Sequence, residues 1–187
     1  MTLDFILYSD FNCPFCYAFG ERIIALGFAD RIAWRGVQHA PYLPIPMAQA
    51  SPAFASELGR EVQFVQRLAP EVSIALPRGK PNTGPAIEAV AAAMNVDPHK
   101  AHRLATSLYC MFWQHGADIS APSVLRNLAR QTDLPDLSIT PEAVKMVNAW
   151  HDAWLARGVG SVPDFIRQDG ESITGLADLD TLRRFVQ

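Results

Sequence analysis

The alternation of apolar and polar positions near the amino terminus predicts a strand, a helix and a second strand. Leu3–Tyr8 is an apolar and aromatic run of strand length, typical of a strand buried in the middle of a sheet. Apolar residues recur at helical spacing within Tyr17–Phe28, and Gly27 lies near the end of that segment. Arg31–Gln38 again has the pattern of a strand. Together these segments predict a βαβ unit with a right-handed crossover.

The middle of the chain carries only helical signals, which begin after the proline-rich segment His39–Pro46. At three places a capping residue is directly followed by proline, which fits the first helical position because its missing N–H would have no partner there. These pairs are Ser51-Pro52, Asp97-Pro98 and Thr140-Pro141. The apolar periodicity predicts helices at Pro52–Leu68, Gly84–Met94, Pro98–His115, Ala121–Thr132 and Pro141–Arg157.

The carboxy-terminal region returns to the pattern of strands. Asp164–Gln168 and Glu171–Thr174 flank Asp169-Gly170, a strong signal for a β-hairpin. Asp178–Val186 then has the pattern of a short amphipathic helix. The predicted order is therefore βαβ, a block of helices, and ββα.

Composition and charge narrow the classes of function. The chain has 187 residues, a net charge of −3 and scattered basic residues, which argues against nucleic acid as the main partner. It has no apolar run long enough to cross a bilayer, so we expect no membrane partner. Three cysteines, an odd number, do not form the framework of a disulfide-rich secreted domain. The amino terminus has neither a basic segment nor a sustained apolar run, so we expect no secretory signal and a cytoplasmic location.

Two of the cysteines, Cys13 and Cys16, lie three positions apart where the first strand gives way to the first helix. A structural zinc site needs four ligands, usually in two close pairs, and the chain has no second pair. We therefore predict that no metal is bound. The third cysteine, Cys110, lies among apolar residues of a predicted helix, and we expect it to be a buried small hydrophobic residue.

Redox chemistry suits the cysteine pair better than metal binding. If Cys13 caps the helix and Pro14 takes its first position, the sulfur of Cys13 lies beside the free amide groups of the first turn. The positive end of the helix dipole then stabilises the thiolate and lowers its pKa. Cys16 lies one turn further on, within disulfide distance but more buried. We predict that exposed Cys13 attacks a partner and that Cys16 resolves the mixed disulfide; two cysteines without function at a helix start are the alternative.

Two motifs resemble one known family. Cys-Pro-Phe-Cys-Tyr after the first strand and Gly-Ser-Val-Pro-Asp-Phe before the terminal hairpin are similar to the DsbA family of thioredoxin-fold proteins. The FrnE-like branch, related to 2-hydroxychromene-2-carboxylate isomerases and kappa-class glutathione transferases, is the most similar, over essentially the whole chain. The resemblance implies an α/β, thioredoxin-like fold (βαβ … ββα) with an all-helical insertion. Its parts would be residues 1–45, 46–158 and 159–187.

The resemblance also implies roles for single residues. Pro163 would be a cis-proline facing the cysteine pair, and the backbone of Val162 would pair with an extended substrate segment. Asp10 stands where FrnE-like proteins often carry an acid that relays a proton during resolution; a solvated loop carboxylate is the alternative. Phe15 replaces the histidine of strongly oxidising relatives, so we expect a less stabilised thiolate and a less oxidising disulfide.

Three functions follow from these observations. The first is a thiol–disulfide oxidoreductase that acts on protein or small-molecule disulfides, with no bound cofactor and glutathione as an optional co-substrate. The second is a glutathione-dependent isomerase or transferase, although such enzymes typically keep a serine in place of Cys13 and lack the second cysteine. The third is a binding or chaperone module with a vestigial redox site. Whether the chain forms a homodimer is left open.

Overall fold

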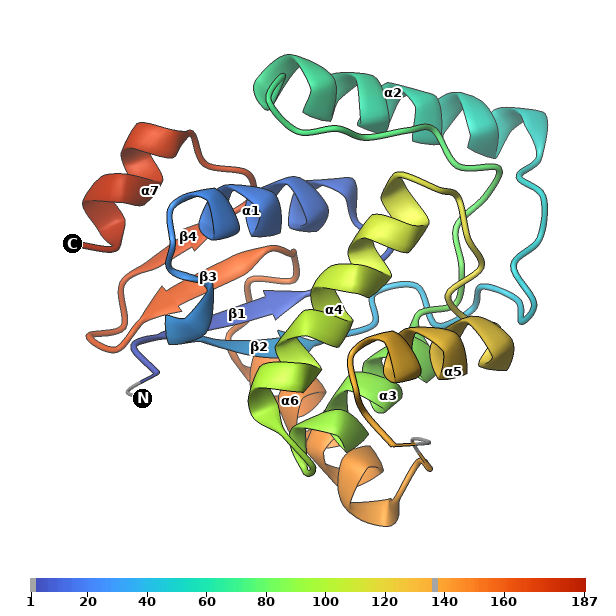
Figure 1. Cartoon of the computed structure of the whole chain (residues 1–187). Coiled ribbons are helices and arrows are strands. Elements are labelled where there is room, and N and C mark those ends of the chain that lie inside the picture. Colours follow the sequence, from blue (N-terminus) through green and yellow to red (C-terminus); the bar gives the residue numbers. More distant parts are fainter. Residues whose placement is uncertain (1–2, 136–137) are drawn as a thin grey trace.

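The computed structural model describes residues 3–135 and 138–187; residues 1–2 and 136–137, which belong to the predicted parts 1–45 and 46–158, lie outside the described residues. Within the described residues the strands form a four-stranded sheet in the order β2-β1-β3-β4 (Figure 1). The strands are β1 (Phe5–Ser9), β2 (Ile32–Gly36), β3 (Asp164–Arg167) and β4 (Ser172–Thr174). Strand β1 is parallel to β2 and antiparallel to β3, and β3 is antiparallel to β4. The predicted central position of the first strand and the predicted hairpin are both confirmed.

The helices follow the predicted order, with small shifts at their ends. They are α1 (Pro14–Ala25), α2 (Pro52–Leu68), α3 (Gly84–Met94), α4 (Pro98–Trp113), α5 (Pro122–Gln131), α6 (Pro141–Ala156) and α7 (Leu179–Phe185), with a short 3₁₀ turn at Ala29–Arg31. Side chains of Ser51, Asp97 and Thr140 accept hydrogen bonds from amide groups of the first turns of α2, α4 and α6, as predicted. Helix α1 begins earlier than its apolar pattern predicts, because Pro14 takes the first helical position after Cys13. It also ends earlier, because the chain reverses at Gly27 with a φ of 75°.

The sheet is covered by helices on both faces (Figure 1). Phe5 of β1 stacks on Phe165 of β3 with ring centroids 5.0 Å apart, and Phe19 of α1 meets the same Phe165 at 5.2 Å. This face therefore packs against α1 and α7. Tyr8, three positions after Phe5 in β1, points to the other face, where it packs with Trp154 of α6. Successive residues of a strand point to opposite faces, so β1 contributes to both cores.

One buried core extends from the sheet into the helical block. Phe11, just after β1, lies 4.7 Å from Tyr109 of α4, and Trp34 of β2 lies 6.1 Å from Trp150 of α6, measured between ring centroids. The indole N–H of Trp113 donates a hydrogen bond of 2.8 Å to the carbonyl oxygen of Phe11. The loop that joins β1 to the cysteine pair is therefore held by α4, a helix about a hundred positions away in the sequence.

Candidate redox site

Cys13 is the residue that caps the amino terminus of α1. Its backbone is extended (φ −97°, ψ 115°), and Pro14 takes the first helical position. The backbone amide of Cys13 donates to the carbonyl oxygen of Asp10 at 3.1 Å. The sulfur faces the segment before β3, since its thiol donates to the carbonyl oxygen of Val162 at 3.7 Å. The peptide bond between Val162 and Pro163 is cis, and Pro163 is buried. Two motifs 149 positions apart in the sequence thus meet at one sulfur atom.

The two thiols of the pair have opposite tendencies to ionise. A hydrogen bond from Cys16 lowers the pKa of Cys13, and the backbone amide of Cys16 and the charge of His39 act in the same direction. Burial raises the pKa of Cys16 well above its usual range, and its hydrogen bond with Cys13 adds to that rise. Cys13 therefore ionises first, while Cys16 keeps its proton and donates a hydrogen bond to the neighbouring thiolate.

The exposure predicted for Cys13 is wrong in degree. Cys13 is only 7% exposed, and Cys16 is 1% exposed. The order is the predicted one, but both thiols lie in the core because the Val162–Pro163 segment packs over the helix start. Cys13 is therefore the more accessible of two largely covered thiols.

Asp10 lies immediately after β1 and is fully buried. One carboxylate oxygen accepts from the hydroxyl of Thr83 at 2.7 Å, and the other accepts from the backbone amide of His39 at 2.9 Å. The second oxygen also lies 2.6 Å from Nδ1 of His39. The alternative of a loop carboxylate in water is therefore wrong. The carboxylate is engaged by its neighbours and holds the loop after β2 against the loop after β1.

His39 is a candidate site residue that our sequence analysis does not identify. Its imidazole is 37% exposed and its pKa is raised, chiefly by the hydrogen bond to Asp10. Its positive charge favours the thiolate of Cys13. The signal was present in the sequence: Asp10 and His39 follow the ends of two adjacent parallel strands, and the carboxyl ends of such strands meet at one edge of a sheet.

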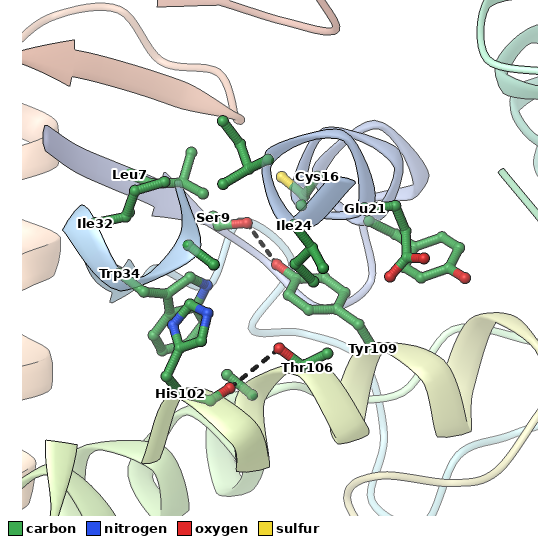
Figure 2. A pocket seen from close by; sticks show the side chains of 15 residues that line it. Leu7, Ser9, Cys16, Glu21, Ile24, Ile32, Trp34, His102, Thr106 and Tyr109 are labelled. Carbon is green, nitrogen blue, oxygen red and sulfur yellow. Dashed lines mark hydrogen bonds between the residues drawn. The ribbon is translucent and has the colours of Figure 1, made fainter. Parts of the chain in front are cut away.

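Behind Cys16 lies a small cavity of about 40 Å³ between α1, the sheet and α4. Figure 2 shows Cys16, Ser9 and Tyr109 side by side at its inner end, with the hydroxyls of Ser9 and Tyr109 hydrogen-bonded to each other. The hydroxyl of Ser9 also forms a hydrogen bond with Cys16, which lowers the pKa of Cys16 and opposes the effect of burial. Burial raises the pKa of Tyr109 well above its usual range, so the phenol keeps its proton. The cavity has room for a few water molecules, and its lining is mostly apolar.

The remaining candidates are placed as follows. Phe15 is half-buried and its ring meets Phe64 of α2 edge-on, with centroids 6.0 Å apart. Cys110 is half-buried rather than buried as predicted, whereas its neighbour Tyr109 is buried in the core. Among residues 3–135 and 138–187, no three His, Cys, Asp or Glu side chains form a group that could hold a metal ion. No helix in the same residues is both long and apolar enough to span a membrane.

Comparison with known proteins identifies the family to which this architecture belongs. The family model of the DSBA-like thioredoxin domain matches residues 4–187. A search of curated proteins finds no match. The cytosolic disulfide reductase DsbM from Pseudomonas aeruginosa superimposes with a TM-score of 0.74 at 14% identity, covering 97% of this chain and 96% of that one. A 2-hydroxychromene-2-carboxylate isomerase gives a TM-score of 0.72 at 17% identity, covering 97% and 93%.

The sheet order, the flanking helices and the cysteine pair at the start of α1 define a thioredoxin-like fold with a helical block between its two halves. The chain belongs to the DSBA-like thioredoxin family. The α/β fold class implied by the sequence motifs is thereby confirmed. At identities of 14% and 17%, the two solved structures establish the fold alone.

Proposed function

We propose that this protein is a thiol–disulfide oxidoreductase that acts on protein or small-molecule disulfides through Cys13 and Cys16. One observation carries the proposal: two thiols without a disulfide lie one turn apart at the start of α1, and their surroundings shift their pKa values in opposite directions. An arrangement that favours one thiolate and keeps its neighbour protonated is what thiol–disulfide exchange requires.

The exchange proceeds in two balanced steps. The Cys13 thiolate attacks one sulfur of a substrate disulfide; a Cys13–substrate disulfide forms, and the other substrate sulfur leaves as a thiolate that takes up a proton. Cys16 then loses its proton and attacks the sulfur of Cys13, which forms the Cys13–Cys16 disulfide and releases the second substrate thiol. The substrate gains two electrons, and the protein loses them. A thiol reductant such as glutathione returns the protein to the dithiol form.

The surroundings of the pair suggest how the substrate is held. The Val162 carbonyl lies beside the attacking sulfur, so an extended substrate segment is proposed to pair with the backbone of Val162, next to Pro163. Asp10 is proposed to act through His39, whose orientation it fixes by two contacts. The role of Asp10 as a proton relay to Cys16 remains a prediction.

The direction of electron flow is proposed to be reduction of the substrate. Phe15 offers no charge to the thiolate, and the charge of His39 is offset by that of Asp10, whose effect on Cys13 is the opposite. The thiolate is therefore less stabilised than in the strongest oxidants, whose cysteine pKa is about 3.5, and the resulting disulfide is less oxidising. A reductase of this kind suits the cytoplasm, and DsbM, which has the same fold, is described as cytosolic.

Trapping of mixed disulfides tests the proposal. The variant Cys16→Ser keeps the attacking thiol and loses the resolving one, so it should accumulate mixed disulfides in cell extract. Cys13→Ser should accumulate far fewer, because Cys16 is buried. Both are made in a Cys110→Ala background, so that the half-buried third thiol adds no signal. Partners are released with a reductant and identified by mass spectrometry. Equal trapping by both variants, or more by Cys13→Ser, contradicts the assigned roles.

A glutathione-dependent isomerase or transferase is the second candidate, favoured by the likeness in fold to the 2-hydroxychromene-2-carboxylate isomerase structure. The intact cysteine pair argues against it, since the reaction needs no second thiol. Insulin reduction with and without glutathione, beside isomerisation of a small aromatic substrate, separates the two. Turnover of the small substrate without disulfide reduction would favour the isomerase. Failure of both reactions would favour a binding module with a vestigial redox site.

A further inference from the structure

A surface groove lies beside the redox pair, between the first turn of α1 and the outer side of α2. It has a volume of about 480 Å³. Phe15, which stands between the two cysteines, contributes one wall, and α2 contributes the rest through Arg60, Glu61, Gln63, Phe64 and Arg67. Helix α2 lies over α1 at the outside of the molecule (Figure 1). We call this feature the α2 groove.

The α2 groove has an aromatic floor that faces solvent. Phe64 is 46% exposed although it belongs to a helix with its own buried face. Its ring meets Phe15 at an interplanar angle of 69°, and the guanidinium of Arg67 lies 5.5 Å from its centroid. A large exposed aromatic side chain beside a reactive group offers apolar contact area to a ligand.

The charge of the α2 groove is positive. Glu61 forms an ion pair with Lys80 at 2.7 Å, so its charge is balanced outside the groove. Arg60 contacts the hydroxyl of Ser56 at 3.3 Å. Within the described part of the chain, neither Arg60 nor Arg67 forms a salt bridge with a carboxylate. Two guanidinium groups are therefore available beside two phenyl rings.

We propose that the α2 groove binds the polypeptide segment that flanks the substrate disulfide, and that it selects segments with an acidic residue beside an apolar one. The carboxylate would lie on Arg60 and Arg67, and the apolar side chain on Phe15 and Phe64. Guanidinium groups bind carboxylates through paired hydrogen bonds. This inference rests on the proposed function, because it names the substrate class of the same redox site.

The position of Phe15 connects the groove to the chemistry. A substrate disulfide bonded to Cys13 lies two residues from Phe15, so the residues next to the substrate cysteine come within reach of the groove. Backbone pairing at Val162 would hold any extended segment, whatever its sequence. The α2 groove would add preference for side chains, and its charge would raise the association rate of acidic partners at low salt.

The test compares two peptides that carry a chromophoric thionitrobenzoate disulfide on one cysteine, with glutathione present to return the protein to the dithiol form and the rate without protein subtracted. One has Glu and Phe beside the cysteine, and the other has Lys and Phe. For the wild-type protein we expect kcat/KM for the acidic peptide to be about tenfold higher, mainly through KM, because each exposed charge contact contributes roughly threefold. The preference should shrink in 0.5 M salt.

Charge-reversed variants locate the preference. Arg60→Glu/Arg67→Glu should abolish or invert it, whereas Arg126→Glu/Arg130→Glu, two exposed arginines of α5 far along the chain, should keep it. The alkylation rate of Cys13 should be equal in all of these proteins, which shows that the thiol chemistry is intact. Phe64→Ala should raise KM for the acidic peptide a few-fold without a change in kcat.

Failure of the groove proposal can be distinguished from failure of the proposed function. Equal turnover of both peptides by the wild-type protein, or a preference that survives in Arg60→Glu/Arg67→Glu, overturns the role of the α2 groove and leaves the proposed function standing. If neither peptide reacts, the proposed function fails, and the groove proposal fails with it.

Discussion

His39, held by Asp10, brings to Cys13 a positive charge that the dipeptide between the cysteines lacks. The imidazole and the carboxylate are 2.6 Å apart, and the carboxylate is fully buried. Of the two, His39 favours the Cys13 thiolate and Asp10 disfavours it. The groups that face His39 are Asp10, Cys13 and Lys80, and the last of these disfavours its protonation.

Loss of His39 should therefore slow the reaction of Cys13 at neutral pH. His39→Ala removes a positive charge, so the pKa of Cys13 should rise and its alkylation by iodoacetamide should slow about two- to fivefold near pH 7. Because the pKa of His39 is raised above 6.5, its charge persists above that pH in the wild type. The two rates should converge at alkaline pH, where both proteins carry the thiolate. Exposed His99→Ala is the control; superimposable pH profiles of His39→Ala and wild type would contradict the assignment.

Ser9 should affect resolution without affecting attack. Its hydroxyl lowers the pKa of Cys16, so Ser9→Ala should raise that pKa further and slow the release of glutathione from a Cys13–glutathione disulfide several-fold. The alkylation rate of Cys13 should be unchanged within about twofold. Stopped-flow measurement of glutathione release, beside alkylation, separates the two steps.

Ser9→Ala should also lower the free energy of unfolding, and a second substitution should restore it. Ser9→Ala leaves the buried hydroxyl of Tyr109 without its partner, at a cost of about 1–3 kcal/mol. Ser9→Ala/Tyr109→Phe should recover most of that stability and keep the slow resolution. A double variant that resolves as fast as wild type would show that Ser9 acts only through the fold.

At this scale, the sequence predicts the residues whose signals are local and misses those brought together by the fold. Cys13 and Cys16 are found from their spacing and from the Pro14 helix start. Ser9 and Tyr109 lie 100 positions apart, and their contact depends on how α4 packs against the end of β1. No periodicity or motif in either segment encodes that packing.

At the scale of elements, the cap and proline pairs make the helix starts predictable, because capping is decided within four residues. The contacts that hold α1 in place are of another kind. Arg22 of α1 is 4% exposed and donates to the carbonyl oxygens of Leu68, at the end of α2, and Ala177, before α7. It also forms an ion pair with Glu71 at 2.7 Å. A single arginine in an amphipathic pattern reads as a solvated side chain, so its role could not be predicted.

Arg22→Ala should destabilise the protein by about 2–4 kcal/mol, because two partly buried carbonyl groups lose their donor and a buried side chain is removed. Glu71→Gln is the matched control, and it should cost under about 1 kcal/mol because Glu71 is 43% exposed. The free energy of unfolding from urea titration measures both. Equal effects of the two substitutions would mean that the ion pair, and not the backbone contacts, stabilises this junction.

At the scale of the whole molecule, the sheet joins both ends of the chain, and the helices from α2 to α6 come between them. The order βαβ, helices, ββα could be predicted because apolar residues recur at different spacings in strands and in helices. The packing of the helical block on the sheet could not, since it depends on contacts such as Trp34 with Trp150 and Phe11 with Tyr109. The predicted division into residues 1–45, 46–158 and 159–187 describes the order along the chain. Whether these parts are independent units remains a prediction.

The continuous core predicts that the protein unfolds as a single cooperative unit. Phe11 and Trp34 are at most 5% exposed and are covered by side chains of the helical block. Exposing each of these two side chains to water costs about 2 kcal/mol. A typical domain is stable by only about 5–15 kcal/mol. We therefore expect the sheet to unfold when the helices are released. Circular dichroism at 222 nm, dominated by helices, and tryptophan fluorescence, to which Trp34 of the sheet contributes, should therefore give coincident urea transitions.

The mutant Trp34→Phe, which leaves tryptophans only outside the sheet, should unfold with the same coincidence. Two separate transitions would show that the helical block is an independent domain inserted into a sheet that folds without it.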